Sequence, residues 1–569
     1  MANFQSRTIF FSTSPRNPEL IPKYLKLIRE EKLENKTYNI NLQTEFYKAL
    51  SKANLADVSS GGNSNNADFS GREKLTRAPQ ALGFLIPRSR QPLKITEAGN
   101  LLMDEQMFED IMIHQLLKFQ LPSPLHKETK GNNKGMFNIK PFLEIIRLVY
   151  ELEYLTYQEL SLYGMTLTDF KDYEKTKNKI KKYRIKRDGI KGSSSLKKQY
   201  EEYRLDIFRK MFADVLNKKE FKVRESKETN EKKFLKTKMN NSRDYTDSVF
   251  RFLRSTGLFV LTKGKSISIS PERMEEVKYI LKHVNREIID PTMPLKEYLQ
   301  YLSNPKVPRL KNDNIDSISK EVESKGLKVK SNDLYEMKKA LNNHRVEKRE
   351  QKILEITNQL KKRNADDIDD IINTFHQITK KEVPNSPAVL EWNTWRAAVM
   401  INNGEVKGNF IPDDNGYPIS TAGGSKGDVV GDYGDFNILY EVTLSSGKRQ
   451  FDMEGEPVPR HIGELKKKSG KDTFGFFIAE KINPESIYHF YLTTGTNSKV
   501  YEGNISVIPM NLKDFIKFFK YSIKSNVQSD DLFEMHQHSI NLSRTCIING
   551  ESEENWYNEL IKYIFDKIN

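Results

Sequence analysis

Hydrophobic and polar positions near the start of the chain follow first a helical and then a strand spacing. Apolar residues recur at helical intervals over 47–55, and 83–86 and 93–95 have the composition of two short strands around a turn at 88–91. Thr96 then precedes a second helical segment, EAGNLLM. A strand pair that leads directly into a helix is typical of a winged-helix unit, so we expect one here.

A second unit of this kind is predicted around residue 150. Residues 141–150 place apolar side chains at helical spacing. Thr156 is followed three positions later by Glu159, which is a capping-box pattern and predicts the start of the next helix.

The third unit has the clearest pattern. Residues 244–256 predict a helix that ends at Gly257, and LFVLTKGKSISIS predicts two alternating strands around a turn at 263–265. Pro271 is then expected to open another helix. The sequence therefore predicts two or three winged-helix-like subdomains within residues 1–289. Such units place a helix in the major groove of DNA, although many serve only as packing or dimerisation modules.

The character of the chain changes after these units. Residues 310–383 are highly charged, their apolar positions have helical spacing, and no Gly or Pro interrupts 334–379. This pattern predicts a helical linker or a coiled-coil-like spacer rather than a compact domain. We assign 290–383 to it, with Pro384 at its end.

The last part of the chain, 384–569, has the pattern of an α/β domain. Residues 388–401 predict an amphipathic helix, and 428–430 and 436–443 predict two strands joined by a tight turn. The expected fold class is therefore a multidomain mixture of α+β and α/β, with winged-helix-like subdomains, a helical linker and a C-terminal α/β domain.

Charge is unevenly distributed along the chain. The formal net charge is +15, and 171–238 contains 24 Lys and Arg against 11 Asp and Glu, an excess of 24 − 11 = +13. Concentrated positive charge displaces counterions from a phosphate backbone, which is the main source of non-specific DNA affinity. We expect this segment to bind DNA, although a solvated basic loop would have the same composition. The candidate contacts are Lys181, Lys182, Arg184 and Lys186.

Several classes of protein are disfavoured by the sequence. Cys546 is the only cysteine, which excludes an internal disulfide framework and a Cys-rich zinc site. No apolar stretch is long enough for a transmembrane helix, and the first residues lack the apolar core of a signal peptide. We therefore expect a cytoplasmic protein without a membrane partner.

Two acidic residues fall on the predicted strand pair of the C-terminal domain. Asp428 opens the first strand and Glu441 lies late in the second, so both carboxylates should meet at one end of the sheet. Glu441 shares its strand face with Leu439 and Thr443, and a charged side chain in so apolar a strand must be paired, liganded or at an edge. Carboxylate oxygens suit Mg²⁺, and one or two such ions can promote hydrolysis of a phosphodiester. The alternative is that both are ordinary surface acids.

The sequence around these acids resembles a known family. The segment TAGGSKGD…ILYEVTLSSGKRQFDMEGEPVPRH is similar to the catalytic region of the AlwI-like type IIS restriction and nicking endonucleases, within the PD-(D/E)xK nuclease superfamily. The resemblance continues in order through STSPRNPE, GFLIPRSRQPLKITEAG, HQLLKFQLPSPLHK, KTKMNNSRDYTDS, FRFLRSTGLF and LEWNTW. It implies an N-terminal recognition region, a helical linker and a C-terminal cleavage domain of restriction-endonuclease fold.

The resemblance also implies the residues of the active site. Asp428, Glu441 and the backbone carbonyl of Val442 are expected to bind Mg²⁺. Glu391, on the preceding helix, is expected to hold a second metal ion or a water bound to one. Glu454 is expected to orient the attacking water or to bind the second ion.

One position departs from the usual superfamily pattern. The Lys that normally follows two residues after the Glu is Thr443 here, and a hydroxyl cannot supply its positive charge. Glu454, Lys448 or His461 could take over this role. Two prolines between Glu454 and His461 argue against a shared helix face, so a packing role or a phosphate contact is the expected role of His461.

The implied activity is that of a type II site-specific deoxyribonuclease that cuts double-stranded DNA a few base pairs outside a short asymmetric site. One catalytic centre cuts one strand. Cutting both strands then requires a transient homodimer or a separate small nuclease subunit, and without either the protein is a nicking endonuclease. A different class of function, a non-catalytic DNA-binding regulator with a vestigial nuclease domain, is the rival hypothesis.

Overall fold

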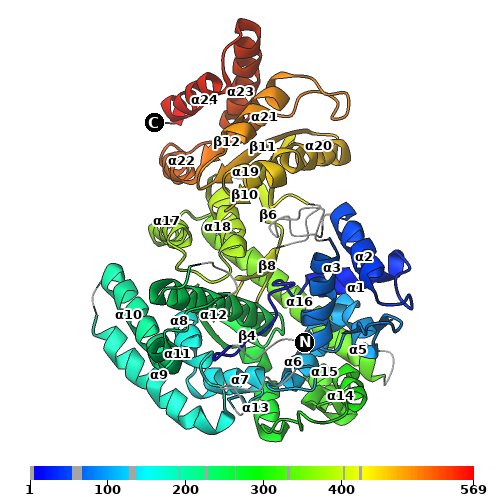
Figure 1. Ribbon diagram of the computed structural model, residues 1–569. Coiled ribbons are helices and arrows are strands. Elements are labelled where there is room, and N and C mark those ends of the chain that lie inside the picture. The colour runs from blue at the N-terminus through cyan, green and yellow to red at the C-terminus, as the bar shows by residue number, and fades with distance from the viewer. Residues whose placement is uncertain are drawn as a thin grey trace. The chain divides into compact units, whose positions relative to one another are not determined.

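The computed structural model describes residues 6–53, 55, 67–126, 136–190, 192–223, 228–262, 264–329, 333–401, 404–421 and 426–568. These residues form two compact units that divide between Glu347 and Lys348, within helix α16 (Leu334–Leu360). We call the part up to Glu347 unit 1 and the part from Lys348 unit 2. Helices predominate in both and each contains β-strands, so the chain has the mixed α+β fold that was predicted (Figure 1).

Unit 1 begins with helices that surround a short β-hairpin. Strands β1 (Leu85–Ile86) and β2 (Lys94–Ile95) pair antiparallel, as predicted. The Thr96 hydroxyl accepts a hydrogen bond of 3.0 Å from the Gly99 amide and caps the helix that follows. The helices of this part are α1 (Leu20–Glu30), α2 (Ile40–Lys52), α3 (Ala67–Thr76), α4 (Ala78–Ala81), α5 (Glu97–Leu102) and α6 (Phe108–Lys118).

The second and third predicted units share one β-sheet. Its strand order is β3-β5-β4, and Leu155 of β3 lies opposite Ile267 of β5. The hairpin predicted between 258 and 270 is present, although Lys263 of its turn lies outside the described residues. The strands are β3 (Leu155–Thr156), β4 (Phe259–Thr262) and β5 (Ser266–Ile269), and the helices are α7 (Pro141–Glu151), α8 (Tyr157–Glu159), α9 (Tyr173–Asp188), α10 (Ser193–Met211), α11 (Ala213–Lys218), α12 (Glu231–Arg254) and α13 (Met274–His283).

The helices of 290–383 are present, but they do not form a spacer of their own. Helices α14 (Leu295–Ser303) and α15 (Ile315–Ser324) belong to unit 1, where α14 buries three large side chains, those of Tyr298, Leu299 and Leu302. Helix α17 (Ala365–Thr379) contributes Phe375 to the core of unit 2. The two observed units thus differ from the expected three parts, because the few apolar residues of this segment suffice to pack each helix onto a neighbour.

Unit 2 is built on a five-stranded sheet with the order β12-β11-β10-β9-β6. Strands β6, β9 and β10 are antiparallel neighbours, whereas β10, β11 and β12 run parallel. All eight residues of the central strand β10 are buried, because helices cover both faces of the sheet (Figure 1). The strands are β6 (Glu405–Gly408), β7 (Phe410–Pro412), β8 (Pro418–Thr421), β9 (Val429–Asp432), β10 (Phe436–Thr443), β11 (Asp472–Ala479) and β12 (Val507–Asn511).

Helix α18 is the buried helix of this unit, and it packs against β9 and β10. It carries Trp392 and Trp395, whose indole N–H groups donate to backbone carbonyls at 2.9 and 3.3 Å. The helices of unit 2 that follow α17 are α18 (Ser386–Ile401), α19 (Lys448–Gln450), α20 (Pro457–Ser469), α21 (Pro484–Gly495), α22 (Leu512–Lys524), α23 (Ser529–Asn549) and α24 (Glu553–Ile568). In the described part of the chain, every helix is too short or too polar to cross a membrane.

Candidate active site

Strand pairing brings Asp428 and Glu441 together. In the antiparallel pair β9–β10, Tyr440 lies opposite Val429, so the next position on each strand places Glu441 opposite Asp428. The Val442 amide donates a hydrogen bond of 2.9 Å to Asp428 Oδ2, and the two carboxyls are hydrogen-bonded to each other. Both side chains therefore occupy the end of the sheet where β9 begins.

Two further acids, Glu391 and Glu454, join them from elements outside the sheet. Glu391 lies on α18, and burial followed by the charges of Asp428, Glu441 and Glu454 holds its pKa well above the usual range. Glu454 lies in η8 (Phe451–Gly455), a single π-helical turn of the kind that often occurs at functional sites. The structure thus brings together all four acids that the family resemblance implied.

Burial and mutual repulsion oppose the ionisation of the four carboxyls. Burial and the neighbouring charge of Glu454 raise the pKa of Glu441 to about 8. Burial also raises the pKa of Glu454 to about 7, and burial followed by the charge of Glu441 raises that of Asp428 well above its usual range. Burial and like-charge repulsion therefore act in the same direction on this cluster, as is common in active sites.

His461 contacts the cluster from α20. Its Nδ1 lies 2.8 Å from Glu441 Oε1, while its buried Nε2 has no hydrogen-bond partner among the described residues. Burial lowers the pKa of the imidazole, so the ring is neutral at neutral pH. Pro457 and Pro459, which argued against a shared helix face, instead form the first turn of α20 and leave His461 within the helix.

Thr443, at the position of the usual Lys, hydrogen-bonds Glu454 through its hydroxyl. The other substitute considered for the Lys, Lys448, is exposed on α19 and forms no hydrogen bond or ion pair with any of the four acids. The sequence did not predict this role for Thr443, because the contact depends on the path of the π-helical turn that carries Glu454.

The chemistry of these side chains fits Mg²⁺. Among the described residues, no three His, Cys, Asp or Glu side chains stand as the ready ligands of one metal ion, and Asp428 and Glu441 bond to each other instead. Mg²⁺ nevertheless prefers carboxylate and carbonyl oxygens and takes few of them from a protein. A divalent cation among these acids would also relieve the repulsion that raises their pKa values.

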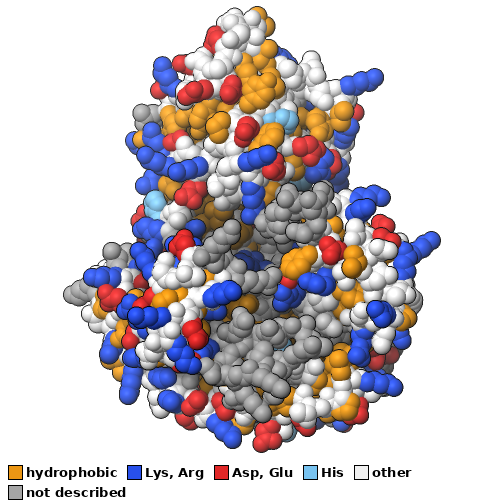
Figure 2. All heavy atoms as spheres, viewed as in Figure 1, with side chains coloured by type: hydrophobic (Ala, Val, Ile, Leu, Met, Phe, Trp, Pro, Cys, Tyr) orange, Lys and Arg blue, Asp and Glu red, His pale blue; other side chains and the backbone are white. Residues whose placement is uncertain are grey.

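The predicted DNA contacts on α9 divide into two kinds. Lys181, Lys182 and Lys186 are exposed. Arg184 is held inside unit 1, because it forms two hydrogen bonds of 2.9 and 3.0 Å with the fully buried carboxylate of Glu159. On the face shown in Figure 2, Lys and Arg side chains are interspersed with Asp and Glu.

We compared the chain with protein families, curated proteins and solved structures. A family model described as AlwI restriction endonuclease matches residues 80–518. No curated protein matches the sequence. Two solved structures are similar to parts of the chain. The small subunit of the heterodimeric restriction endonuclease R.BspD6I is 27% identical, with 35% of this chain and 100% of that chain covered and a TM-score of 0.29.

The second is the BpuJ1 endonuclease binding domain, solved in complex with pyrene- and phenanthrene-modified DNA. It is 14% identical, with 50% of this chain and 92% of that chain covered and a TM-score of 0.32. The family match extends over most of the chain, from within unit 1 to within unit 2, and takes in the whole acidic cluster. The protein therefore belongs to the AlwI restriction endonuclease family.

Proposed function

We propose that this protein is a Mg²⁺-dependent type IIS restriction endonuclease. It would hydrolyse a phosphodiester of double-stranded DNA outside its recognition sequence and leave 5′-phosphate and 3′-hydroxyl ends. The observation that carries the proposal is the cluster of four carboxyls with raised pKa values at the end of the β9–β10 pair, of which Glu441 is buried and the other three are half-buried. Such a cluster is costly to the fold and is expected where a ligand of opposite charge completes it.

In this proposal Asp428, Glu441 and the backbone carbonyl of Val442 hold the metal ion, and Glu391 holds a second one. When bound, Mg²⁺ polarises the phosphodiester and supplies positive charge near the leaving oxygen. The Val442 amide, which donates to Asp428, fixes the orientation of that carboxylate. The chain therefore positions its proposed ligands through the backbone of β10 as well as through side chains.

Two residues can serve the attacking water. With Glu441 ionised, His461 donates its Nδ1 hydrogen to that carboxylate, which leaves the Nε2 lone pair available to take a proton from water. Glu454 orients the water, and the Thr443 hydroxyl holds Glu454 in place. Together these groups would replace the Lys of the usual pattern.

The number of strands that are cut follows from the number of catalytic clusters. The described part of each chain contains one such cluster, so one chain alone should nick a single strand. Cleavage of both strands would require a second centre, either from a transient homodimer or from a separate small nuclease subunit. On a supercoiled plasmid the two cases yield an open circle and a linear product, respectively.

The proposal is tested with supercoiled plasmid, Mg²⁺ and run-off sequencing of the ends. Asp428→Ala should reduce cutting by several orders of magnitude, because it removes a metal ligand, while DNA binding in EDTA stays unchanged. Asp432→Ala is the matched control, since Asp432 ends the strand β9 that Asp428 directly precedes, but is exposed and paired with Lys471 at 2.8 Å. A wild-type protein that binds the plasmid and leaves it intact would instead be a regulator.

The role of α9 in DNA binding is tested separately. Lys181, Lys182 and Lys186 can be replaced by Ala together, whereas Arg184 is left in place because Glu159 depends on it. If each Lys contacts one phosphate, the slope of log affinity against log salt should fall by about 2.7. An unchanged slope would mean that α9 does not touch DNA.

A further inference from the structure

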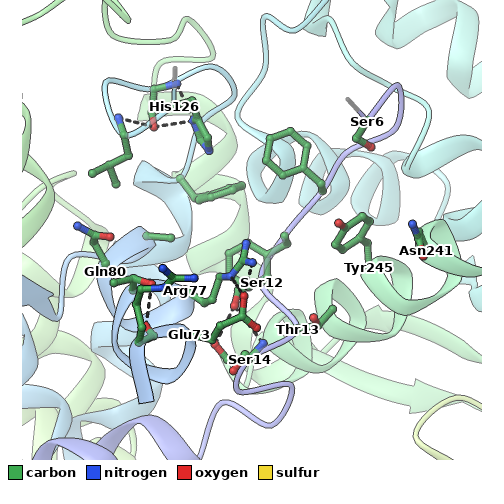
Figure 3. A pocket seen from close by; sticks show the side chains of 18 of the residues that line it. Ser6, Ser12, Thr13, Ser14, Glu73, Arg77, Gln80, His126, Asn241 and Tyr245 are labelled. Atoms are coloured by element: carbon green, nitrogen blue, oxygen red, sulfur yellow. Dashed lines mark hydrogen bonds and ion pairs between the residues drawn. The ribbon is translucent and has the colours of Figure 1, made fainter. Parts of the chain in front are cut away.

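A large cavity lies within unit 1, whereas the acidic cluster belongs to unit 2. It has a volume of about 1120 Å³, and its walls are the chain segment 6–14, helices α3 and α4, the β1–β2 turn and helix α12. Figure 3 shows Arg77 and Gln80 on one side and Asn241 and Tyr245 on the other, with Ser12, Thr13 and Ser14 between them. This volume exceeds that of most small-molecule sites, so it suits a segment of a larger ligand.

The walls of the cavity carry an excess of positive charge. Among the described residues that line it, five are Lys or Arg and one, Glu73, is acidic. Two of the arginines are already neutralised, Arg7 by Asp214 at 2.7 Å and Arg77 by Glu73 at 3.1 Å. The other basic residues of the lining are Arg72, Arg88 and Lys238.

Arg72 and Arg88 are the cations most clearly available to a ligand. Neither forms an ion pair with a described residue, and Arg72 lies over the ring of Phe69 with its guanidinium carbon 4.9 Å from the ring centroid. The guanidinium group presents several donors in one plane and binds phosphate in a bidentate manner. Arg72 and Arg88 together could therefore bind an anion that has several phosphate oxygens.

The cavity also contains uncharged hydrogen-bonding groups. Ser242 on α12 is 2% exposed, and its Oγ has no hydrogen-bond partner within the described structure. A buried hydroxyl without a partner is destabilising, so such a group is expected where a ligand supplies the missing bond. Gln80 on α4 is half-buried on the opposite wall, and its side-chain amide can donate and accept at once.

We propose that this cavity is the part of unit 1 that reads the sequence of the target DNA. Arg72 and Arg88 contact phosphates there, and Gln80 and Ser242 hydrogen-bond base edges. Side-chain amides and hydroxyls that the fold has not already engaged can distinguish base edges, and this cavity places Gln80 and Ser242 beside Arg72 and Arg88. The inference rests on the proposed function, since it assigns the recognition step of that same nuclease.

The phosphate contacts are tested by salt-dependent binding in EDTA. Arg72 and Arg88 are replaced by Ala together, and the anisotropy of a fluorescent 30-base-pair duplex of mixed sequence reports binding to the full-length protein. Two lost phosphate contacts should lower the log–log slope by about 1.8. Replacement of Lys306 and Arg309, which are exposed cations outside the cavity, removes the same charge and should leave the slope unchanged.

A second pair of variants tests base reading. Gln80→Ala and Ser242→Ala should each reduce the preference for a duplex that carries the wild-type recognition sequence over scrambled duplex by about tenfold, with non-specific affinity unchanged. Arg72→Lys with Arg88→Lys should restore the slope, and thermal melting establishes that each variant is folded.

The proposal would be overturned if the double Ala variant of Arg72 and Arg88 kept the wild-type salt slope and if Gln80→Ala and Ser242→Ala kept the wild-type sequence preference. Failure of the wild-type protein to cut in Mg²⁺ would instead contradict the nuclease function, because the binding measurements do not depend on cleavage.

Discussion

Glu441→Gln removes one of the four carboxyls of the active-site cluster but keeps the size of the side chain and its oxygen. The substitution should abolish DNA cutting, because a proposed metal ligand becomes a neutral amide. It should also stabilise unit 2 when no metal is present. The reason is that Glu441 is 5% exposed and its ionised form is disfavoured by burial and by Glu454.

The magnitude follows from the pKa of Glu441 in the folded protein. A rise from 4.5 to about 8 means that the wild-type fold is most stable below pH 4.5 and loses stability as the pH rises towards 8. Each tenfold change in the ionisation constant is worth about 1.4 kcal/mol, and at pH 7 folding must protonate a carboxyl that is ionised in the unfolded chain, so the shift lowers the free energy of unfolding by about 3 kcal/mol. Glu441→Gln should recover about this amount, which raises the melting temperature by roughly 6–12 °C.

Tryptophan fluorescence follows this unfolding selectively. The three tryptophans of the chain, Trp392, Trp395 and Trp556, are all buried in unit 2. Melting curves in EDTA should separate wild type and variant at pH 8 and converge near pH 4.5. Added Mg²⁺ should stabilise the wild-type protein and have little effect on the variant.

The matched control is Glu480→Gln, because Glu480 is exposed just after β11. This variant should melt as the wild type does at every pH. Equal melting temperatures for wild type and Glu441→Gln at pH 8 would refute the reasoning, because an ionised carboxyl in the cluster would then carry no cost.

Three further substitutions probe other contacts. Thr443→Val removes the hydroxyl bonded to Glu454 and should slow plasmid nicking about 10- to 100-fold; a wild-type rate would exclude this contact from catalysis. Arg286→Ala leaves the buried carboxylate of Glu144 without its cation and should destabilise unit 1 by about 3 kcal/mol, measured by calorimetry against wild type. Gly71→Ala places a methyl group 2.0 Å from a backbone oxygen of α2 and should cost about 1–3 kcal/mol in the same experiment; an unchanged unit 1 transition would contradict either prediction.

Features encoded within a few residues were predictable from the sequence. The capping box is an example, since the Glu159 amide donates to Thr156 Oγ1 at 3.1 Å and the Thr156 amide donates to Glu159 Oε2 at 2.9 Å. The β-hairpins and the end of α12 near Gly257, with φ of 65°, are of the same kind. In each case the residues that set the structure are neighbours in sequence.

The packing of the predicted linker could not be predicted from residues that are neighbours in sequence. Phe375 of α17 meets Phe515 of α22 edge to face, with ring centroids 5.9 Å apart, and 140 positions of chain separate the two residues. A helical pattern indicates which face of α17 is apolar but not which element covers that face. The same limit applies to Arg184, whose partner Glu159 belongs to another helix.

The candidate site was predicted partly from local sequence patterns and partly from the family resemblance. The meeting of Asp428 and Glu441 followed from the expected strand pair, whereas Glu391 and Glu454 were identified only through the resemblance to the AlwI family. The sequence does not predict that His461 lies within a helix, because the two prolines before it favour an interruption, whereas in the structure they begin α20. The sequence pattern could not distinguish these two roles of proline.

The position of Glu441 shows why the cluster is better explained by function than by stability. Strand β10 is buried at every position, and an apolar residue at 441 would pack between Phe477 of β11 and the start of β9 at no electrostatic cost. The fold instead places a carboxyl there, adds three more around it, and supports Glu441 with His461, whose second nitrogen has no partner among the described residues. The clustered carboxyls lower the stability of unit 2, and together with His461 they would supply oxygen ligands and a proton acceptor at one point. A group of residues that is unfavourable for folding but consistent in its chemistry is what a hydrolytic metal site requires.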